Sequence, residues 1–421
     1  MSAWPVLSLG EAASPEKGAI ISGPFGSNIG KRFFVDSGVP VIRGNNLADP
    51  DTRFKDEGFV YLSDAKARAL NCWALPDDLI FTAAGSLGQV GLIPNDGQYP
   101  RYVISNKQLR IRLDQTKISP LFAYYYFSAP NMRAYVANQN KGSSVPLITL
   151  GVLRSLPIVQ PPLPTQRKIA AILTAYDELI DNNKRRVKLV EEVARRIYHE
   201  WFADLRYPGH ESVPLVASEL GPIPQGWKLR PLFDVAEVAF GFPFKSELFN
   251  AETGIPLVRI RDLPNGQTAT RTTETASGSN RVHDGDILIG MDGDFHMCRW
   301  SAGDAWLNQR VARLRPAIPD VSAYGLFLAL EKPVADWNRA IVGTTVAHLG
   351  KRHLELIKII TPSRPIAARI ANVLNPIFDL EIALRKATRC LRAARDLLLP
   401  NLISGAIDVT DLDIAMPPTA A

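Results

Sequence analysis

The sequence contains few cysteines and no long apolar run. Its three cysteines, Cys72, Cys298 and Cys390, lie far apart and show no pairing pattern. This usage is typical of a protein kept in a reducing cytoplasm. No apolar stretch approaches the ~20 residues that cross a bilayer, and the first residues, MSAWPVLSLGEAA, lack the basic and apolar segments of a secretory leader. We therefore expect a cytoplasmic protein that does not engage a membrane.

The sequence also lacks the motifs of enzymes that modify or cleave DNA. An N6-adenine methyltransferase holds its base in an Asn/Asp-Pro-Pro-aromatic loop. The nearest match, QPPL (160–163), has neither the usual acceptor nor the ring. GPFGSNIGKR (23–32) departs from the phosphate-binding loop because Phe25 and Arg32 stand at two required positions. The pairs His296 with Cys298 and His348 with His353 are too small for a zinc site. We expect no catalytic residue, no metal and no cofactor in this chain.

The composition supports two globular domains. The chain has 421 residues, of which 46% are hydrophobic and 21% charged, as in ordinary soluble proteins. Its net charge is +6 and its pI is near 9.1. A basic balance is compatible with nucleic-acid binding, but by itself it is weak support.

Residues 165–206 are predicted to form one long helix. Thr165 is a plausible N-cap, and no Pro or Gly follows before Pro208. Apolar residues recur at alternating steps of three and four, with one irregular step at Asn183, which is typical of a coiled-coil seam. The helix would be roughly 60 Å long and needs a partner. Its predicted seam contains Ile169, Ile172, Tyr176, Leu179, Val190 and Ile197.

A second long helix is predicted over residues 364–404. Pro376 predicts a kink near Asn375, and Pro400 marks the approximate end. We expect the two helices to pair in an antiparallel coiled coil; the alternative is two amphipathic helices packed on separate cores. The predicted seam of this helix contains Ile370, Val373, Ile377, Leu380, Leu384, Leu391 and Leu398.

The chain contains an internal repeat. GVPVIRGNNL (38–47) matches GIPLVRIRDL (254–263), PDDLIFTAAG (76–85) matches DGDILIGMDG (284–293), and SNKQLRIRL (105–113) resembles LNQRVARL (307–314). The longest match joins residues 142–173 to 343–374 without a gap and runs into both predicted helices. Matches that keep their order indicate duplication.

The predicted fold is α/β (α+β): two copies of one globular domain, separated by two long helices. The expected segments are a first globule at 1–160, a central helix at 161–206, a linker at 207–226, a second globule at 227–362, a C-terminal helix at 363–407 and a flexible tail at 408–421. If the helices pair antiparallel, the two halves are related by an internal pseudo-twofold axis. Duplex DNA has the same kind of symmetry, so the globules would suit half-sites about one turn, roughly 34 Å, apart.

The repeated strips resemble the specificity (S) subunit of type I restriction–modification systems. The likeness is carried by IVQPPLPTQRKIAAIL (158–173), IITPSRPIAARIANVL (359–374) and SELGPIPQGWKLRPLFDVAEV (218–238), and it covers essentially the whole chain. It implies that each globule recognises one half of a split sequence in double-stranded DNA. It also implies that the helices set the unread gap and dock two modification subunits, which bind S-adenosylmethionine and methylate adenine N6. Restriction subunits would join through them, and the S chain itself would be non-catalytic.

Candidate DNA contacts follow from the side-chain code of the major groove, in which Arg and Lys reach guanine and Asn reaches adenine. Small hydroxyl and backbone groups suit phosphate contacts. Local pairing at a strand end, or a turn before a strand, remains the alternative for each position. The candidates are Arg43, Asn45, Asn46, Lys107, Lys141, Ser143 and Ser144 in the first globule, and Arg259, Arg261, Arg271, Arg310, Thr344 and Thr345 in the second.

Two other functions remain open. The chain could be a coiled-coil adaptor without DNA specificity, or a methyltransferase with its own recognition arms. Steeply salt-dependent DNA retention would oppose the first. Absence of methyl transfer from S-adenosylmethionine by the pure chain would oppose the second.

Overall fold

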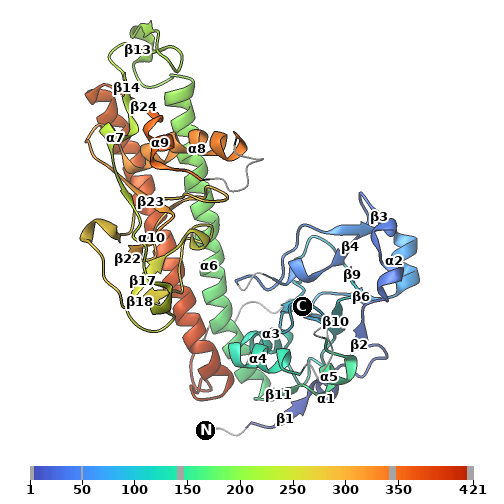
Figure 1. Ribbon diagram of the computed structural model, residues 1–421. Coiled ribbons are helices and arrows are strands. Elements are labelled where there is room, and N and C mark those ends of the chain that lie inside the picture. Colours follow the sequence, from blue (N-terminus) through green and yellow to red (C-terminus); the bar gives the residue numbers. More distant parts are fainter. Residues whose placement is uncertain (1–3, 49–50, 140–146, 341–347, 415–421) are drawn as a thin grey trace. The chain divides into compact units, whose positions relative to one another are not determined.

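The computed structural model describes residues 4–48, 51–139, 147–340 and 348–414, and the chain divides into two compact units (Figure 1). Unit 1 is Met1–Asn182 with Cys390–Ala421, and unit 2 is Asn183–Arg389. Two long helices, α6 (Leu163–Tyr198) and α10 (Arg364–Ile403), each contribute one segment to each unit. Each unit therefore contains one globule and a part of both helices.

The first globule is built on two sheets with a shared core, and short helices pack against the first of them in a separate core. One sheet has the order β2 (Ile20–Ser22), β10 (Gln108–Ile111), β7 (Leu79–Thr82), β8 (Val90–Leu92) and is antiparallel throughout. The other has the order β3 (Phe34–Val35), β5 (Val60–Leu62), β4 (Val39–Ile42), β9 (Tyr102–Ile104), β6 (Trp73–Ala74), with β4 and β9 parallel. Strand β1 (Val6–Ser8) pairs with β11 (Pro157–Val159) and so joins the two ends of the globule.

The second globule repeats this plan strand for strand. Its sheets have the orders β15 (Ala236–Phe240), β23 (Val311–Pro316), β20 (Ile287–Gly290), β21 (Met297–Arg299) and β16 (Phe249–Asn250), β18 (Arg271–Thr272), β17 (Ile255–Val258), β22 (Ala305–Leu307), β19 (Arg281–Val282). Again one pair, β17 and β22, is parallel, and β14 (Lys228–Pro231) pairs with β24 (Lys358–Thr361) at the ends of the globule. The predicted duplication is confirmed.

The helices of the two globules do not all correspond. In the first globule, α1 (Leu9–Ala12), α2 (Asp64–Leu70) and α5 (Leu150–Ser155) accompany a pair, α3 (Pro120–Ser128) and α4 (Pro130–Ala137). The pair is divided at Pro130, and proline is favoured at the first position of a helix. In the second globule, α7 (Leu232–Val235) and α9 (Lys351–Glu355) accompany a single helix, α8 (Ala323–Ala340), which continues through Pro333.

The long helices begin and end a few residues from their predicted limits. Helix α6 begins at Leu163, so Thr165 is a buried residue of the first turn and not the N-cap that we predicted. Pro164 lies in the first turn of α6, where a backbone N–H has no partner within the helix, so the proline does not prevent the helix from starting before Thr165. After Tyr198 a π-helical turn continues to Ala203. Helix α10 is unbroken through Pro376 and ends at Ile403. Among the described residues no helix combines the length and hydropathy of a membrane span.

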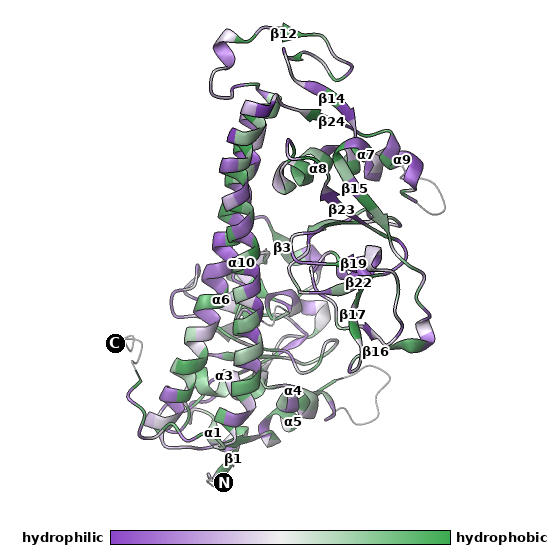
Figure 2. Ribbon diagram, turned by 90° about the vertical axis from the view of Figure 1, so that its left-hand side faces the viewer, coloured by the Kyte–Doolittle hydropathy of each residue, from purple (hydrophilic) through white to green (hydrophobic). Residues whose placement is uncertain are grey.

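The two helices pair antiparallel within each unit. In unit 1, Nη1 of Arg395 on α10 lies 2.9 Å from Oδ1 of Asp177 on α6. In unit 2, Nη2 of Arg385 lies 2.7 Å from Oε1 of Glu191. In unit 1, Lys168 near the start of α6 also donates to the Thr410 carbonyl beyond the end of α10, and in unit 2, Arg369 near the start of α10 donates to the Pro208 carbonyl beyond the end of α6. Within each unit the residue number along α10 therefore falls as the number along α6 rises, so the chain directions oppose each other. Figure 2 shows the two helix segments of each unit side by side, with hydrophobic and hydrophilic residues alternating along them.

The seam differs from the predicted one by single residues. Ile169, Ile370 and Leu384 are buried as expected, and Ile172, Tyr176, Val190, Ile197, Ile377, Leu391 and Leu398 are half-buried. Leu179, Val373 and Leu380 are exposed, so they do not line the seam; their neighbours Ile180, Leu374 and Glu381 are buried instead. On α10 the buried positions then recur every seven residues at Leu374, Glu381, Thr388 and Arg395. Apolar spacing could not reveal this register because three of the four positions are polar.

Two segments expected to be irregular are ordered parts of the structure. In the predicted linker 207–226, β12 (Leu215–Val216) pairs with β13 (Ile223–Pro224), and Tyr207, Ile223 and Trp227 form a small core. In the predicted flexible tail, Val409 is buried and the Thr410 carbonyl accepts a 2.6 Å hydrogen bond from Lys168 Nζ. The tail is therefore anchored to unit 1 as far as the structure describes it.

Candidate nucleic-acid interface

The end of strand β4 forms a turn that repeats in the second globule. After Ile42 the chain enters a 3₁₀ turn, Gly44–Asn46. The Asn46 side chain is only 1% exposed; its Oδ1 accepts the Arg43 N–H at 2.9 Å, and its Nδ2 donates to the carbonyls of Lys55 and Glu57. These bonds use both ends of the amide. Asn46 therefore holds the turn in place, and we no longer count it among the candidate DNA contacts.

The matching turn of the second globule is Ile260–Asp262. There Oδ2 of Asp262 accepts the Arg259 N–H at 2.9 Å, the same bond that Asn46 makes in the first globule. Because this bond fixes the turn, the side chains on either side of it are presented at the end of the strand. Asn45 and Arg261, at equivalent places, are both exposed, and Arg43 and Arg259 are half-buried.

A polar cleft of about 540 Å³ lies in the first globule beside this turn. Its walls come from the end of β4, the end of β7 and the turn between β9 and β10. The polar lining residues are two cations, four amides and three hydroxyls: Arg43, Lys107, Asn45, Gln89, Asn106, Gln108, Thr82, Ser86 and Ser105. Three of the predicted contacts, Arg43, Asn45 and Lys107, are thus brought to one site. Donors and acceptors at this density suit the edges of bases.

The equivalent site of the second globule carries a different charge pattern. Lys107 lies just before β10 in the first globule, and Arg310 lies just before the equivalent strand, β23, in the second. Arg310 Nε lies 3.2 Å from Asp292 Oδ2, and His348 Nδ1 lies 2.6 Å from Asp292 Oδ1. The place of Asp292 in the repeat is taken by Ala84 in the first globule, as the matching bridges Ala84–Leu147 and Asp292–His348 show. In the second globule the Asp292 carboxylate therefore partly neutralises the charge of the exposed Arg310.

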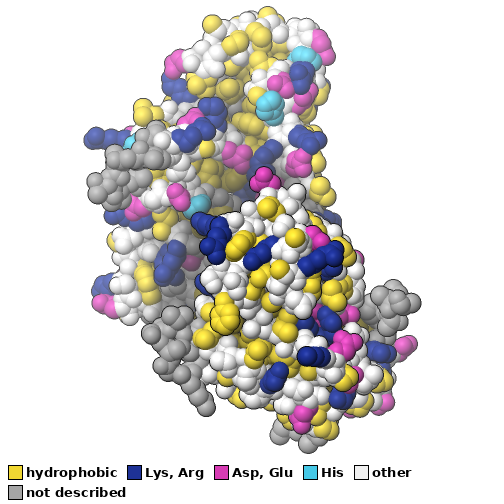
Figure 3. All heavy atoms as spheres, turned by 90° about the vertical axis from the view of Figure 1, so that its right-hand side faces the viewer, with side chains coloured by type: hydrophobic (Ala, Val, Ile, Leu, Met, Phe, Trp, Pro, Cys, Tyr) yellow, Lys and Arg dark blue, Asp and Glu magenta, His cyan; other side chains and the backbone are white. Residues whose placement is uncertain are grey.

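The remaining predicted contacts are less informative. Arg271 lies on β18 opposite Pro256, and its Nη1 donates a 2.8 Å bond to the Gly254 carbonyl, so part of its guanidinium is used within its own sheet. Lys141, Ser143, Ser144, Thr344 and Thr345 lie outside the described residues. Figure 3 shows that the Lys and Arg side chains on the face of unit 1 that it presents are scattered and do not form one continuous patch.

At the other end of the strands that lead to each site, a buried carboxylate ties two strands together. Arg112 holds Asp78 through two bonds, Nε–Oδ1 at 2.9 Å and Nη2–Oδ2 at 3.0 Å, and Arg315 holds Asp286 in the same way at 2.5 and 2.8 Å. Both carboxylates are buried. Such two-pronged pairs fix orientation as well as distance. The repeat places Asp78 on Asp286, but no pattern in the sequence pairs either carboxylate with its arginine.

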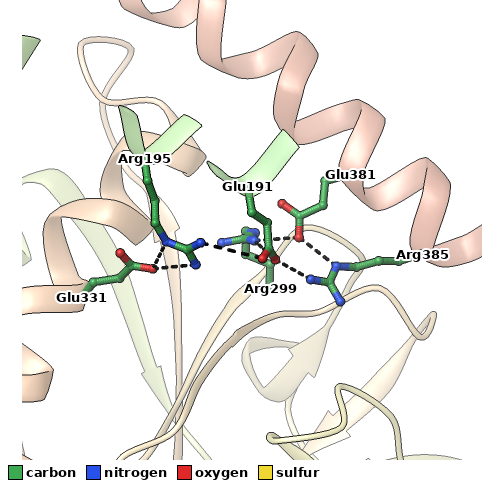
Figure 4. Close-up of polar contacts among 6 residues, drawn as sticks. All are labelled: Glu191, Arg195, Arg299, Glu331, Glu381 and Arg385. Atoms are coloured by element: carbon green, nitrogen blue, oxygen red, sulfur yellow. Dashed lines mark hydrogen bonds and ion pairs between the residues drawn. The ribbon is translucent and has the colours of Figure 1, made fainter. Parts of the chain in front are cut away.

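Each globule is also joined to both long helices of its own unit by buried charges. In unit 2, Arg299 Nη2 of β21 lies 2.6 Å from Glu381 on α10 and 2.9 Å from Glu191 on α6 (Figure 4). Arg385 contacts the same two carboxylates at 2.8 and 2.7 Å. Burial raises the pKa of Glu381, but the charges and hydrogen bonds of Arg299 and Arg385 outweigh it, and the net pKa lies below the usual value.

Unit 1 has a cluster of the same kind with other residues. Arg392 on α10 contacts Asp51 of the first globule, and Arg395 lies 3.4 Å from Asp51 and 2.9 Å from Asp177 on α6. The Tyr125 hydroxyl donates a 2.6 Å bond to Asp177 Oδ2. Sequence reasoning missed both clusters. The polar residues at seven-residue spacing on α10, Glu381, Thr388 and Arg395, would have been the signal.

Comparison with known proteins supports one family. The model of the type I restriction modification DNA specificity domain matches twice, at residues 36–192 and 224–389. The MjaIX specificity subunit of Methanocaldococcus jannaschii is 23% identical over 390 residues, covering 89% of this chain and 88% of that protein. The HindI specificity subunit of Haemophilus influenzae is 22% identical and covers 97% of this chain and 100% of that protein.

A solved structure shares the fold. The crystal structure of the type I restriction–modification S subunit from M. genitalium aligns with a TM-score of 0.58 at 15% identity, covering 95% of this chain and 96% of that one. The two domain matches coincide with the two globules and the helix segments that follow them. This chain therefore belongs to the type I restriction–modification DNA specificity family.

Proposed function

We propose that this chain reads a split sequence in double-stranded DNA on behalf of a type I restriction–modification complex. The observation that carries the proposal is the repeat of one two-sheet globule that presents an arginine at the same strand end in both copies, Arg43 and Arg259. Each copy reads one half of the target. The surfaces around this arginine differ, so the two half-sequences differ.

The proposed contact residues are the exposed or half-buried polar side chains at these two sites. They are Arg43, Asn45 and Lys107 in the first globule and Arg259, Arg261 and Arg310 in the second, with Arg271 beside them. Arg and Lys suit guanine, and Asn suits adenine. The net charge of +6 adds a salt-dependent attraction to the phosphates.

The long helices set the unread gap and carry the partner subunits. Leu189 and Val193 are large apolar side chains that α6 leaves exposed, as expected of a docking surface. We propose that two N6-adenine methyltransferase subunits dock here and at the globules, that S-adenosylmethionine binds to those subunits, and that restriction subunits join through them. The chain itself then performs no catalysis and works in the cytoplasm, where the DNA is.

Mapping of methylated adenines across the genome tests this function. Cells that contain this chain and its partner subunits should show N6-methyladenine at one split motif, and deletion of the chain should remove it. Methylation that persists without the chain contradicts the proposal. Methyl transfer by the pure chain would favour a methyltransferase instead, and DNA retention that does not weaken with salt would favour an adaptor.

A further inference from the structure

Three side chains of the second globule converge at one carboxylate. Nε of Arg310 lies 3.2 Å from Asp292 Oδ2, and His348 Nδ1 lies 2.6 Å from Asp292 Oδ1, so both carboxylate oxygens are engaged. The Arg310 side chain is nevertheless 54% exposed. We propose that Arg310 binds one guanine of the half-site read by the second globule, and that Asp292, held by His348, is the positioning residue that orients its guanidinium. This rests on the proposed function.

The backbone fixes the place of Arg310. Its φ of 71° lies in the left-handed region, which a non-glycine residue seldom adopts. The Met291 N–H, just beyond β20, donates to the Arg310 carbonyl at 2.8 Å. The preceding Gln309 N–H donates to the carbonyl of Phe242, just beyond β15, at 2.9 Å. Strained residues persist where their surroundings hold them, and they are concentrated at ligand contacts.

The fold does not require the charged side chains of this contact. The backbone bridge between Asp292 and His348 has a counterpart in the bridge between Ala84 and Leu147 of the first globule. Neither Ala84 nor Leu147 carries a charge, so the same backbone pairing forms without a carboxylate and an imidazole. The contact of Asp292 with Arg310 and His348 is therefore an addition to the shared scaffold, placed at the proposed DNA-contact site.

The charges favour a base over a phosphate as the ligand. A phosphate is anionic, and Asp292 beside Arg310 would repel it. Guanine O6 and N7 are neutral acceptors that accept two hydrogen bonds from one guanidinium. The contact with Asp292 uses Nε; among the described residues Nη2 has no polar partner, and Nη1 has only His348 Nδ1, at 3.4 Å. The two outer nitrogens are therefore left for guanine.

An atomic substitution in the DNA tests the contact. In 7-deazaguanine a C–H group replaces N7, and Watson–Crick pairing is kept. Once the split motif is mapped, each of its guanines is replaced in turn, and duplex binding by the full complex is measured. At one guanine the replacement should weaken wild-type binding roughly tenfold, the size of one hydrogen bond to a charged group. Arg310→Ala should weaken target binding roughly five- to 150-fold and remove the effect of the replacement at that guanine alone.

Combining each variant with each replacement separates this chain from the methyltransferase subunits. The losses from a residue and an atom in contact do not add, whereas the losses add if the atom is held by another subunit. Arg310→Lys keeps the charge but not the planar fork, and it should lose most of the N7 effect. Arg271→Ala is the matched control, because Arg271 Nη1 donates to the Gly254 carbonyl of its own globule, and it should keep the N7 effect at this guanine.

Asp292→Ala tests the positioning role. The variant has the residue that the first globule has at this place, so the backbone pairing should remain. Arg310 is then no longer oriented, and the N7 effect should fall. Loss of one negative charge should at the same time strengthen the binding of non-target DNA. A loss of binding that is equal for target and non-target DNA, or an unchanged N7 effect, would overturn the positioning role.

The outcomes separate the inference from the function. Specific binding by the wild-type complex with no guanine coupled to Arg310 overturns the inference alone. Equal weakening of target and non-target DNA by Arg310→Ala, with a shallower salt dependence, would indicate a phosphate contact and would also overturn it. Absence of any target preference in the wild type overturns the proposed function and the inference together.

Discussion

At the scale of single residues, the most consequential side chains are charges placed where an apolar residue would be expected. Glu381 is fully buried on α10, although the adjacent Leu380 would satisfy an apolar seam. Arg299 and Arg385 compensate its charge. A buried ion pair adds little net stability compared with an apolar replacement, but removing one partner is costly. We interpret the cluster as the device that fixes the second globule at one place on its helix segments.

Removal of a single partner should therefore destabilise unit 2 strongly. Arg299→Ala leaves Glu381 buried with one guanidinium fewer, and we expect a loss of about 3–5 kcal/mol in the free energy of unfolding. The double variant Arg299→Met with Glu381→Leu keeps the Glu191–Arg385 pair and should recover most of that loss. Urea titration followed by tryptophan fluorescence, to which buried Trp300 contributes, measures both variants. Equal losses in the single and double variants would refute the pairing.

The same carboxyl should make stability depend on acid pH. The pKa of folded Glu381 lies below its usual value because of the arginines, so its stabilising contribution is complete above the unfolded value near 4.5 and is lost as pH falls through the lower folded value. Wild-type chain should lose stability over this acid range more steeply than Glu381→Gln. Denaturation midpoints measured from pH 6 downward check this, and parallel curves would show that Glu381 does not contribute.

At the scale of elements, the long helices show how far periodicity can predict packing. Their existence, length and opposed directions follow from apolar residues at steps of three and four. The register does not, because Leu179 is 51% exposed while neighbouring Ile180 is fully buried. A one-residue shift along a helix turns a side chain by about 100°. Only the neighbouring helix and globule decide which of two adjacent apolar residues faces inward.

A pair of substitutions at these neighbours tests the observed register. Ile180→Ala removes a buried side chain and should cost about 2–5 kcal/mol of unfolding free energy. Leu179→Ala is the matched control, with the same helix, a similar volume change and an exposed site, and should stay within about 0.5 kcal/mol of wild type. Denaturant titration of the two variants side by side gives the answer. A larger loss at Leu179 would restore the register predicted from the sequence.

At the scale of the whole chain, two globules with the same strand order present different side chains at their proposed DNA-contact sites. The first globule has a polar cleft with Lys107, and the second has Ile260 over Gly290 and Asp292 beside Arg310. The long helices supply both units with their anchoring charges. The expected pseudo-twofold relation of the units stays a prediction, and it follows if the antiparallel pairing seen within each unit continues between them.

Deletion of one heptad from each helix, where unit 1 meets unit 2 in the sequence, should shorten the gap in the DNA target. Seven residues span about 10 Å of helix, which is roughly three base pairs. Genome-wide mapping of methylated adenines should then show both half-motifs unchanged and the spacer reduced. Changed half-motifs would contradict the role of the helices as a spacer.

The sequence by itself determined the elements that depend on local periodicity and on repetition. It predicted two long helices, two α/β globules of one plan and the family resemblance, because these are recorded in spacing and in matched strips. The tertiary structure alone decided which side chains work together. Arg299 with Glu381, Asp51 with Arg392, and Ile260 with Gly290 each join residues far apart in the chain. Packing and burial select such partners, and a linear pattern does not contain them.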